Sequence, residues 1–179
     1  MTDTPILSRR ALLQGATLTI GTAAFLRTAL SPTPSVAQGE MPPGTVHSFS
    51  KGGVTFHTYL SPAMTVNVTS HIVEFADQLL LVDSTFMPPT AMELSALVAS
   101  TGKPVAKAII SHEHPDHWGG ASFIEGVTFD TLPEVREGLR AEAEGGQFGT
   151  PTNLLDGGDI TPGMTEISGV PVEFRHYRD

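Results

Sequence analysis

Three histidines and an aspartate crowd into six consecutive positions directly after a short apolar segment. The segment is Val105-Ala106-Lys107-Ala108-Ile109-Ile110, and the run after it is Ser111-His112-Glu113-His114-Pro115-Asp116-His117-Trp118-Gly119-Gly120. The apolar segment predicts a buried strand, and the two glycines predict a turn. The chain must therefore fold so that a cluster of good metal-binding side chains lies where a buried strand ends.

The spacing of this cluster indicates how it could bind divalent cations. His112 and His114 lie two positions apart, so their side chains point to the same side if the strand geometry continues. Asp116 and His117 follow on a turn and can face back from another direction. Four such ligands could serve two adjacent ions, and zinc, iron and manganese all suit them. The alternative is a histidine-rich surface loop, but four ligands rarely converge by accident.

The pattern His-x-His-x-Asp-His followed by Gly-Gly, after an apolar strand, resembles the first metal motif of the metallo-β-lactamase superfamily. The resemblance implies an α+β fold, the αββα sandwich, with a metal site at one edge. It implies that His112 and His114 bind a first zinc ion, and that Asp116 and His117 bind a second. On the same likeness Asp116 is catalytic, because it would both ligate and orient the attacking hydroxide.

A second segment agrees with this resemblance. The run Gln78-Leu79-Leu80-Leu81-Val82-Asp83-Ser84-Thr85 resembles a conserved strand of the family that ends in aspartate. Its apolar part fits a buried strand. Asp83 would then orient a ligand histidine without binding the metal, although an aspartate here could also cap a helix or a turn. The next residues, Thr90-Ala91-Met92-Glu93, predict a capping box that opens a helix ending at Gly102.

Several residues near the cluster leave two interpretations open. Glu113 points away from the metal if the strand period holds, which makes it a solvated carboxylate. Trp118 either walls the site or packs in the core. His176 is either a further metal ligand or an exposed histidine at a strand end, where Arg175 and Arg178 would repel a dication.

The remaining elements follow from turn signals and apolar spacing. They are a hairpin over 48–59 that turns at Gly52-Gly53, a short strand over 126–129, a helix from Pro133 to about Glu144, and a hairpin over 164–174. His47, His57 and His71 lie in the early sheet region, where we expect hydrogen-bonded scaffold rather than ligands.

Residues 1–37 resemble a twin-arginine export signal. Ser8-Arg9-Arg10 precedes a moderately apolar stretch, and Ser35-Val36-Ala37 supplies small residues for cleavage. We therefore expect a domain over 38–179, the twin-arginine export machinery as a partner, and a periplasmic or secreted location. The alternative is a membrane anchor, but Arg27 and several threonines make the stretch too polar, so no stable anchor is expected.

Composition narrows the function further. The chain has 10 Lys and Arg residues against 19 Asp and Glu residues, and it contains no cysteine. Without cysteine there are no disulfides and no thiolate ligands, which leaves His, Asp and Glu to bind a metal. A chain this acidic binds nucleic acid poorly, because the attraction to phosphates needs Lys and Arg. We therefore expect no nucleic acid as a partner. The resemblance to the superfamily implies a small-molecule substrate, which composition does not identify.

Two functions from different classes remain. The first is an exported metal-dependent hydrolase, in which metal-activated water attacks an ester, lactone, lactam, thioester or sulfate ester. The second is an incomplete metal-binding domain without activity. We expect the family's remaining ligands to lie beyond Asp179, so that the chain supplies only the N-terminal part of the sandwich. A minor variant of the first uses one iron for oxidation.

Overall fold

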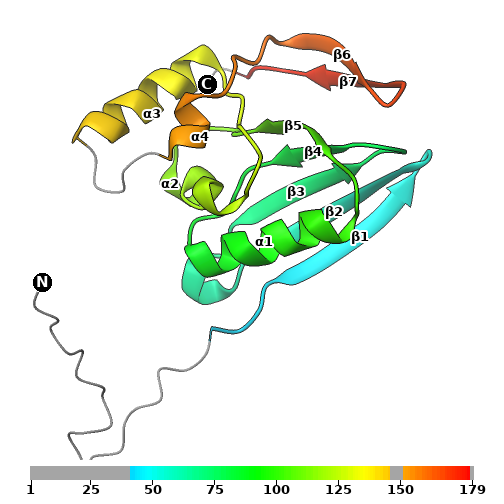
Figure 1. Ribbon diagram of the computed structural model, residues 1–179, viewed down its shortest axis with the longest axis horizontal. Coiled ribbons are helices and arrows are strands. Elements are labelled where there is room, and N and C mark those ends of the chain that lie inside the picture. The colour runs from blue at the N-terminus through cyan, green and yellow to red at the C-terminus, as the bar shows by residue number, and fades with distance from the viewer. Residues whose placement is uncertain (1–40, 146–150, 178–179) are drawn as a thin grey trace, which may run out of the picture. The chain divides into compact units, whose positions relative to one another are not determined.

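A five-stranded sheet is the centre of the described part of the chain, which comprises residues 41–145 and 151–177 in a computed structural model (Figure 1). Its strands stand in sequence order: β1 (Thr45–Lys51), β2 (Val54–Leu60), β3 (Thr69–Glu74), β4 (Leu79–Val82) and β5 (Val105–Ile109). The first four strands are antiparallel neighbours, whereas β5 runs parallel to β4. A parallel pair needs a crossover, which helix α1 (Pro88–Ser100) supplies.

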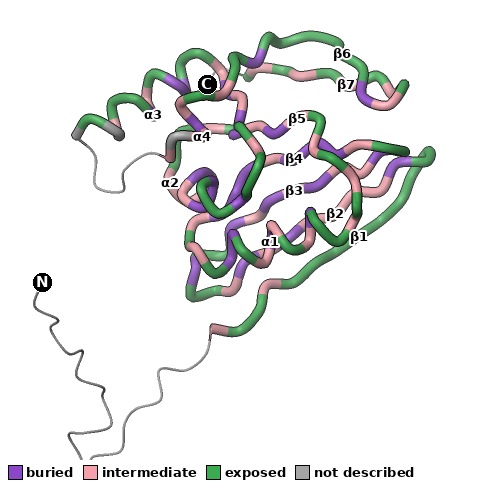
Figure 2. The backbone as a smooth tube through the Cα atoms, in the orientation of Figure 1, coloured by how far each residue is buried: buried purple, intermediate pink, exposed green. Residues whose placement is uncertain are grey.

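The first hairpin confirms the prediction from its turn residues. Gly52 and Gly53 connect β1 to β2 with φ angles of 62° and 81°, a left-handed conformation that glycine adopts without strain. The strand β1 is the border of the sheet, and all seven of its residues are exposed (Figure 2). The predicted scaffold role also holds for two histidines, since His57 hydrogen-bonds to Ser48 and Glu74, and His71 to Thr58.

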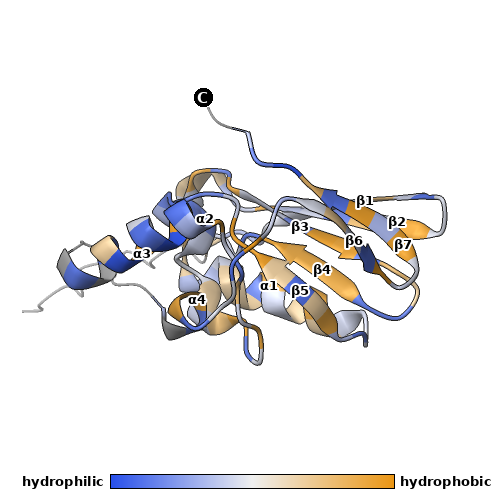
Figure 3. Ribbon diagram, turned by 90° about the horizontal axis from the view of Figure 1, so that it is seen from above, coloured by the Kyte–Doolittle hydropathy of each residue, from blue (hydrophilic) through white to orange (hydrophobic). Residues whose placement is uncertain are grey.

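The apolar run of β4 is explained by the burial of this strand on both of its faces. Leu79 and Leu81 pack in one core cluster together with Leu94 of α1. Leu80 points to the other face and packs in a second cluster together with Ile167. Alternating side chains of a strand face opposite ways, so a strand covered on both sides must be apolar throughout. The hydrophobic colour of β4 in Figure 3 shows this apolar character.

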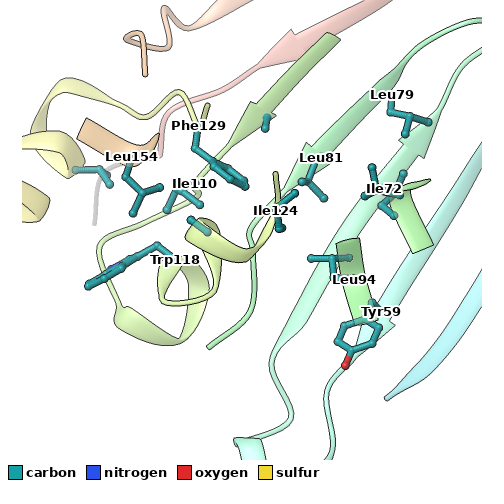
Figure 4. Packing of buried hydrophobic residues seen from close by; sticks show 14 of the residues in the cluster. Tyr59, Ile72, Leu79, Leu81, Leu94, Ile110, Trp118, Ile124, Phe129 and Leu154 are labelled. Atoms are coloured by element: carbon teal, nitrogen blue, oxygen red, sulfur yellow. The ribbon is translucent and has the colours of Figure 1, made fainter. Parts of the chain in front are cut away.

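The two faces of the sheet are covered by different layers. One face carries α1. The helices α3 (Pro133–Gly145) and α4 (Thr152–Leu155) contribute to the same main core, which includes Leu94, Phe129 and Leu154 (Figure 4). The other face carries the predicted second hairpin, made of β6 (Gly163–Ile167) and β7 (Val170–Phe174). Short elements complete the path: η1 (Ala63–Thr65), α2 (Pro115–Trp118) and η2 (Ala121–Phe123).

Two predictions about elements were wrong. The helix α1 begins at Pro88 after the N-cap residue Met87, and no side chain caps it. Glu93 does not complete a capping box; its carboxylate accepts hydrogen bonds from the Tyr59 hydroxyl at 2.7 Å and the Gly44 amide at 2.8 Å. The segment 126–129 forms no strand. Two isolated bridges involve instead the residues that follow it, Asp130 and Thr131.

The expected export signal and the expected lack of a stable membrane anchor remain predictions. In residues 41–145 and 151–177, no helix combines the length and apolar character needed to cross a bilayer. The predicted export signal over 1–37 lies outside the described residues.

Candidate functional site

The loops after β4 and β5 meet at one edge of the sheet, because the carboxyl ends of neighbouring parallel strands lie together. The amide of Asp83, directly after β4, donates to the carbonyl of Ile109 at 2.9 Å. The amide of the next residue, Ser84, donates to the carbonyl of His117 at 2.8 Å. Asp83 and the four residues predicted as metal ligands therefore lie on two loops held against each other.

The four residues predicted as metal ligands come together on this edge. The ring centroids of His112 and His114 are 4.7 Å apart, and those of His112 and His117 are 4.0 Å apart. The carboxylate of Asp116 lies 3.7 Å from Nε2 of His117. The expectation that His112 and His114 point to the same side agrees with these distances, although residues 111–114 are not part of the strand.

Asp83 joins the two loops through its carboxylate, which is almost fully buried. One oxygen accepts the amide of Ser111, and the other accepts its hydroxyl, each at 2.8 Å. The second oxygen also lies 2.8 Å from Nδ1 of His117. With Nδ1–H donating to Asp83, a neutral His117 keeps its lone pair on Nε2, as a metal ligand must. The alternative that Asp83 caps the following helix is wrong, because Met87 is the N-cap residue.

The histidines differ in their affinity for protons. The hydrogen bond to Asp83 raises the pKa of His117, and this effect outweighs the opposing effect of burial. Burial lowers the pKa of His112, and the neighbouring charge of His117 lowers it further. When no metal is bound, His117 therefore holds a proton more tightly than His112 does.

The two glycines of the motif let the loops approach closely. The amide and the hydroxyl of Ser84 both donate to the His117 carbonyl, and the Gly120 amide donates to the Thr85 carbonyl at 3.0 Å. A Cβ atom on Gly120 would lie 2.3 Å from the carbonyl oxygen of Ser84. A Cβ on Gly119 would lie 2.7 Å from the carbonyl oxygen of Phe86. Any larger residue at these two positions would push the histidine loop, residues 111–117, away from Asp83.

Trp118 belongs to the core, which decides between the two interpretations of this residue. Its side chain is 1% exposed and packs in the main cluster (Figure 4). Its indole Nε1 donates a hydrogen bond of 2.7 Å to the carbonyl of Glu113. The tryptophan thus supports the histidine loop from beneath.

An open cavity of about 580 Å³ lies beside the histidines. It is lined by three groups of residues: 111–114 of the histidine loop, Leu132, Glu134 and Val135 at the start of α3, and 175–177 after β7. Glu113 lines this cavity as well and is exposed, in agreement with a solvated carboxylate, while its direction relative to a metal stays a prediction. The strand period that motivated this expectation has already ended at Ile109.

His176 faces the same cavity and pairs with a partner that the sequence does not reveal. Its Nε2 lies 3.0 Å from a carboxylate oxygen of Glu134 at the start of α3. Its side chain is half-buried, with 21% exposed, so it is not the fully exposed histidine of one interpretation. Neither Glu134 nor Ser84 was expected at the site. Ser84 follows Asp83 directly, and this adjacency is the signal that could have indicated it.

The donor set fits a divalent cation in its chemistry. Three imidazoles and a carboxylate gather here, and Asp83 leaves Nε2 of His117 free to bind. Among the described residues, no three His, Cys, Asp or Glu side chains are already arranged to hold one ion together. The ligand assignment of His112, His114, Asp116 and His117, and the orienting role of Asp83, stay predictions.

Comparison with known proteins agrees with this fold. Residues 64–176 match a family model described as the Metallo-beta-lactamase superfamily. The metallo-beta-lactamase FIM-1 from Pseudomonas aeruginosa, in its mono-zinc form, is 22% identical with a TM-score of 0.51, over 72% of this chain and 57% of that one. A metallo-beta-lactamase from Pontibacter korlensis is 23% identical with a TM-score of 0.51, over 72% of this chain and 59% of that one.

These solved structures are similar in fold, and this chain spans less than two thirds of their length. The family match extends over most of the described residues and includes both loops of the candidate site. The α+β fold class and the resemblance that the His-x-His-x-Asp-His pattern carries are therefore confirmed. This chain belongs to the metallo-beta-lactamase superfamily.

Proposed function

We propose that this chain functions as a metal-dependent hydrolase, in which activated water attacks a small-molecule substrate. The observation that carries the proposal is the gathering of His112, His114, Asp116 and His117 beside an open cavity, with Asp83 behind His117. Membership of the superfamily supports hydrolysis as the type of reaction.

The ligand set favours zinc, with iron or manganese as alternatives. His112 and His114 would hold one ion, and Asp116 and His117 a second. The mono-zinc form of the lactamase from Pseudomonas aeruginosa supports zinc by analogy. A bound zinc ion supplies a nucleophile at neutral pH, because it lowers the pKa of its water toward about 7.

The protein's own residues would prepare this chemistry. Asp83 holds Nδ1 of His117 and so presents Nε2 toward the site. Asp116, whose side chain is 37% exposed, would accept a hydrogen bond from the attacking water and take up its proton on a carboxylate oxygen. The cavity would admit the substrate between the histidine loop and α3.

The cavity does not select one substrate class by charge, since Glu113 and Glu134 line it together with Arg175. Esters, lactones, lactams, thioesters and sulfate esters all remain substrates to test. We propose that nucleic acid is not one of them, because the chain has a formal net charge of −9.

The proposal is tested by metal content and turnover of the full chain. Protein expressed with added zinc, iron and manganese is analysed by mass spectrometry for bound metal, before and after His114→Ala and His117→Ala. We expect bound metal and hydrolysis of at least one substrate class in the original protein, and loss of both in each variant. His47→Ala is the matched control, because His47 lies exposed on β1.

Two other outcomes are informative. Metal-free protein whose properties do not change in the two variants would refute the metal site. Metal binding without any turnover would support the second function, a metal-binding domain without activity.

We also propose that residues 1–37 direct export through the twin-arginine machinery to the periplasm or beyond. The support is the Arg9-Arg10 pair with its moderately apolar continuation. The double substitution Arg9→Lys, Arg10→Lys should leave the protein in the cytoplasm at its unprocessed mass. Cell fractionation and mass spectrometry check this, and unchanged export of the variant would contradict the proposal.

A further inference from the structure

Trp118 ends α2 and reaches back into the loop that precedes this helix. Its indole Nε1 donates to the carbonyl oxygen of Glu113 at 2.7 Å. The ring is 1% exposed and shares the main core cluster with Ile110 and Leu154 (Figure 4). A close-packed core is rigid, so one peptide group of the histidine loop is held in a defined orientation.

That peptide group lies between two predicted ligands. Glu113 stands between His112 and His114, and residues 111–114 belong to no helix or strand. The backbone orientation there is consequently not set by a regular ladder of hydrogen bonds. Turning the Glu113 carbonyl changes ψ of Glu113 and φ of His114, and with them the direction of the His114 side chain relative to His112.

Other contacts hold the two ends of the loop. At the start, the Asp83 carboxylate accepts the amide of Ser111 at 2.8 Å. At the end, Ser84 donates to the His117 carbonyl at 2.8 Å. The indole of Trp118 holds the middle. The attachments at the two ends come from the loop after β4, whereas the middle one comes from Trp118 on α2. The middle one can therefore be removed while the ends stay in place.

We propose that Trp118 is a positioning residue whose indole N–H, through the Glu113 carbonyl, holds His112 and His114 at the separation that a divalent cation requires. The inference rests on the proposed metal-dependent function and adds a residue that touches neither ion nor substrate. Removing a group that supports a ligand typically weakens metal affinity about 10–100-fold. Because Trp118 acts through the backbone, we expect the lower end of this range.

The sequence makes an unusually selective test possible. The chain contains one tryptophan, so replacing tryptophan throughout the protein alters residue 118 alone. Expression in a tryptophan auxotroph with β-(3-benzothienyl)alanine keeps the ring shape and exchanges the N–H for sulfur. The full chain is then titrated with Co²⁺, and its dissociation constant and visible absorption spectrum are compared with those of the unmodified protein.

We expect the sulfur analogue to bind Co²⁺ about tenfold more weakly and with a changed spectrum. Trp118→Phe, which is genetically encoded, should reproduce both effects. A purely structural role would lower the thermal midpoint and leave both cobalt readouts unchanged, and that result overturns the proposal.

Leu94→Ala is the matched control for general destabilisation, because Leu94 is a fully buried residue of the same core cluster but lies on α1. It should lower the thermal midpoint and leave the cobalt spectrum as it is. A spectral change as large as that of the analogue would overturn the role of Trp118. If the unmodified protein binds no cobalt, the proposed function itself has failed, whereas equal binding by both proteins refutes Trp118 alone.

Discussion

Asp83 connects more of the candidate site than any other single side chain described above. Its two carboxylate oxygens reach the amide and hydroxyl of Ser111 and the ring of His117. Its backbone has a φ of 62°, a conformation that costs a non-glycine residue energy. The surrounding contacts must offset this cost, and the gain is a carboxylate that points at both loops at once.

The first prediction concerns the charge of Asp83. In chelator-treated protein, Asp83→Asn should lower the pKa of His117 toward its ordinary value. The reason is that a neutral amide replaces the charged carboxylate whose hydrogen bond raises this pKa. A raised pKa stabilises the folded state below the ordinary pKa, and this contribution is lost as the pH rises through the raised value. The variant should therefore lose more stability at about pH 6 than at about pH 9.

Two measurements check this prediction. Nuclear magnetic resonance follows the titration of His117, and urea unfolding at the two pH values follows the free energy of unfolding. Glu166→Gln is the control, since Glu166 lies exposed on β6. An unchanged His117 titration in Asp83→Asn would contradict the assigned cause.

Among the loops and helices, alanine substitutions at two glycines should change the stability of the protein in opposite directions. Gly120→Ala should destabilise the protein by about 1–3 kcal/mol, because its Cβ would overlap the Ser84 carbonyl and separate the two loops. Gly138→Ala should stabilise it by about 0.5–1 kcal/mol, because Gly138 lies inside α3 and its Cβ would meet Glu113 at an ordinary 3.5 Å. Urea unfolding measures both, and a stabilising Gly120→Ala would refute the close approach of the loops.

Elements with local signals are predictable from this sequence. The apolar run over 79–82 and the Gly52-Gly53 turn carry their structure in neighbouring residues. The capping box failed because Glu93 has a better partner in Tyr59, which lies 34 positions away in the sequence and beside it in the fold. A local sequence pattern predicts a contact correctly only where the fold places no more favourable hydrogen-bond partner beside the residue.

The third prediction concerns the packing of the β6–β7 hairpin on the sheet and its contribution to the stability of the protein. Ile167 of β6 is buried in the second core cluster, against the face of the sheet opposite α1. Ile167→Ala should cost about 2–5 kcal/mol. Met164→Ala, in the same strand but 66% exposed, should change stability by less than about 0.5 kcal/mol. Equal effects in urea unfolding would show that the hairpin does not cover the sheet as described.

The candidate site was predictable in its parts and not in its surroundings. The spacing of His112, His114, Asp116 and His117 is local, so the sequence alone points to a shared cluster. The cavity depends on Glu134 and His176, which meet only because α3 and the end of β7 fold onto the same edge. Such tertiary neighbours leave no trace in spacing or periodicity, so one sequence cannot reveal them.

The parallel pairing of β4 with β5 has a consequence for the order in which this molecule assembles. Asp83 and Ser111 lie 28 positions apart, and the chain between them must wind α1 and return before they can meet. Closing such a path costs entropy before any contact rewards it, which makes non-local pairings slow steps. We expect the histidine loop to acquire its final shape after the strands and the crossover helix have docked. The candidate site is then the last part of this region to fold.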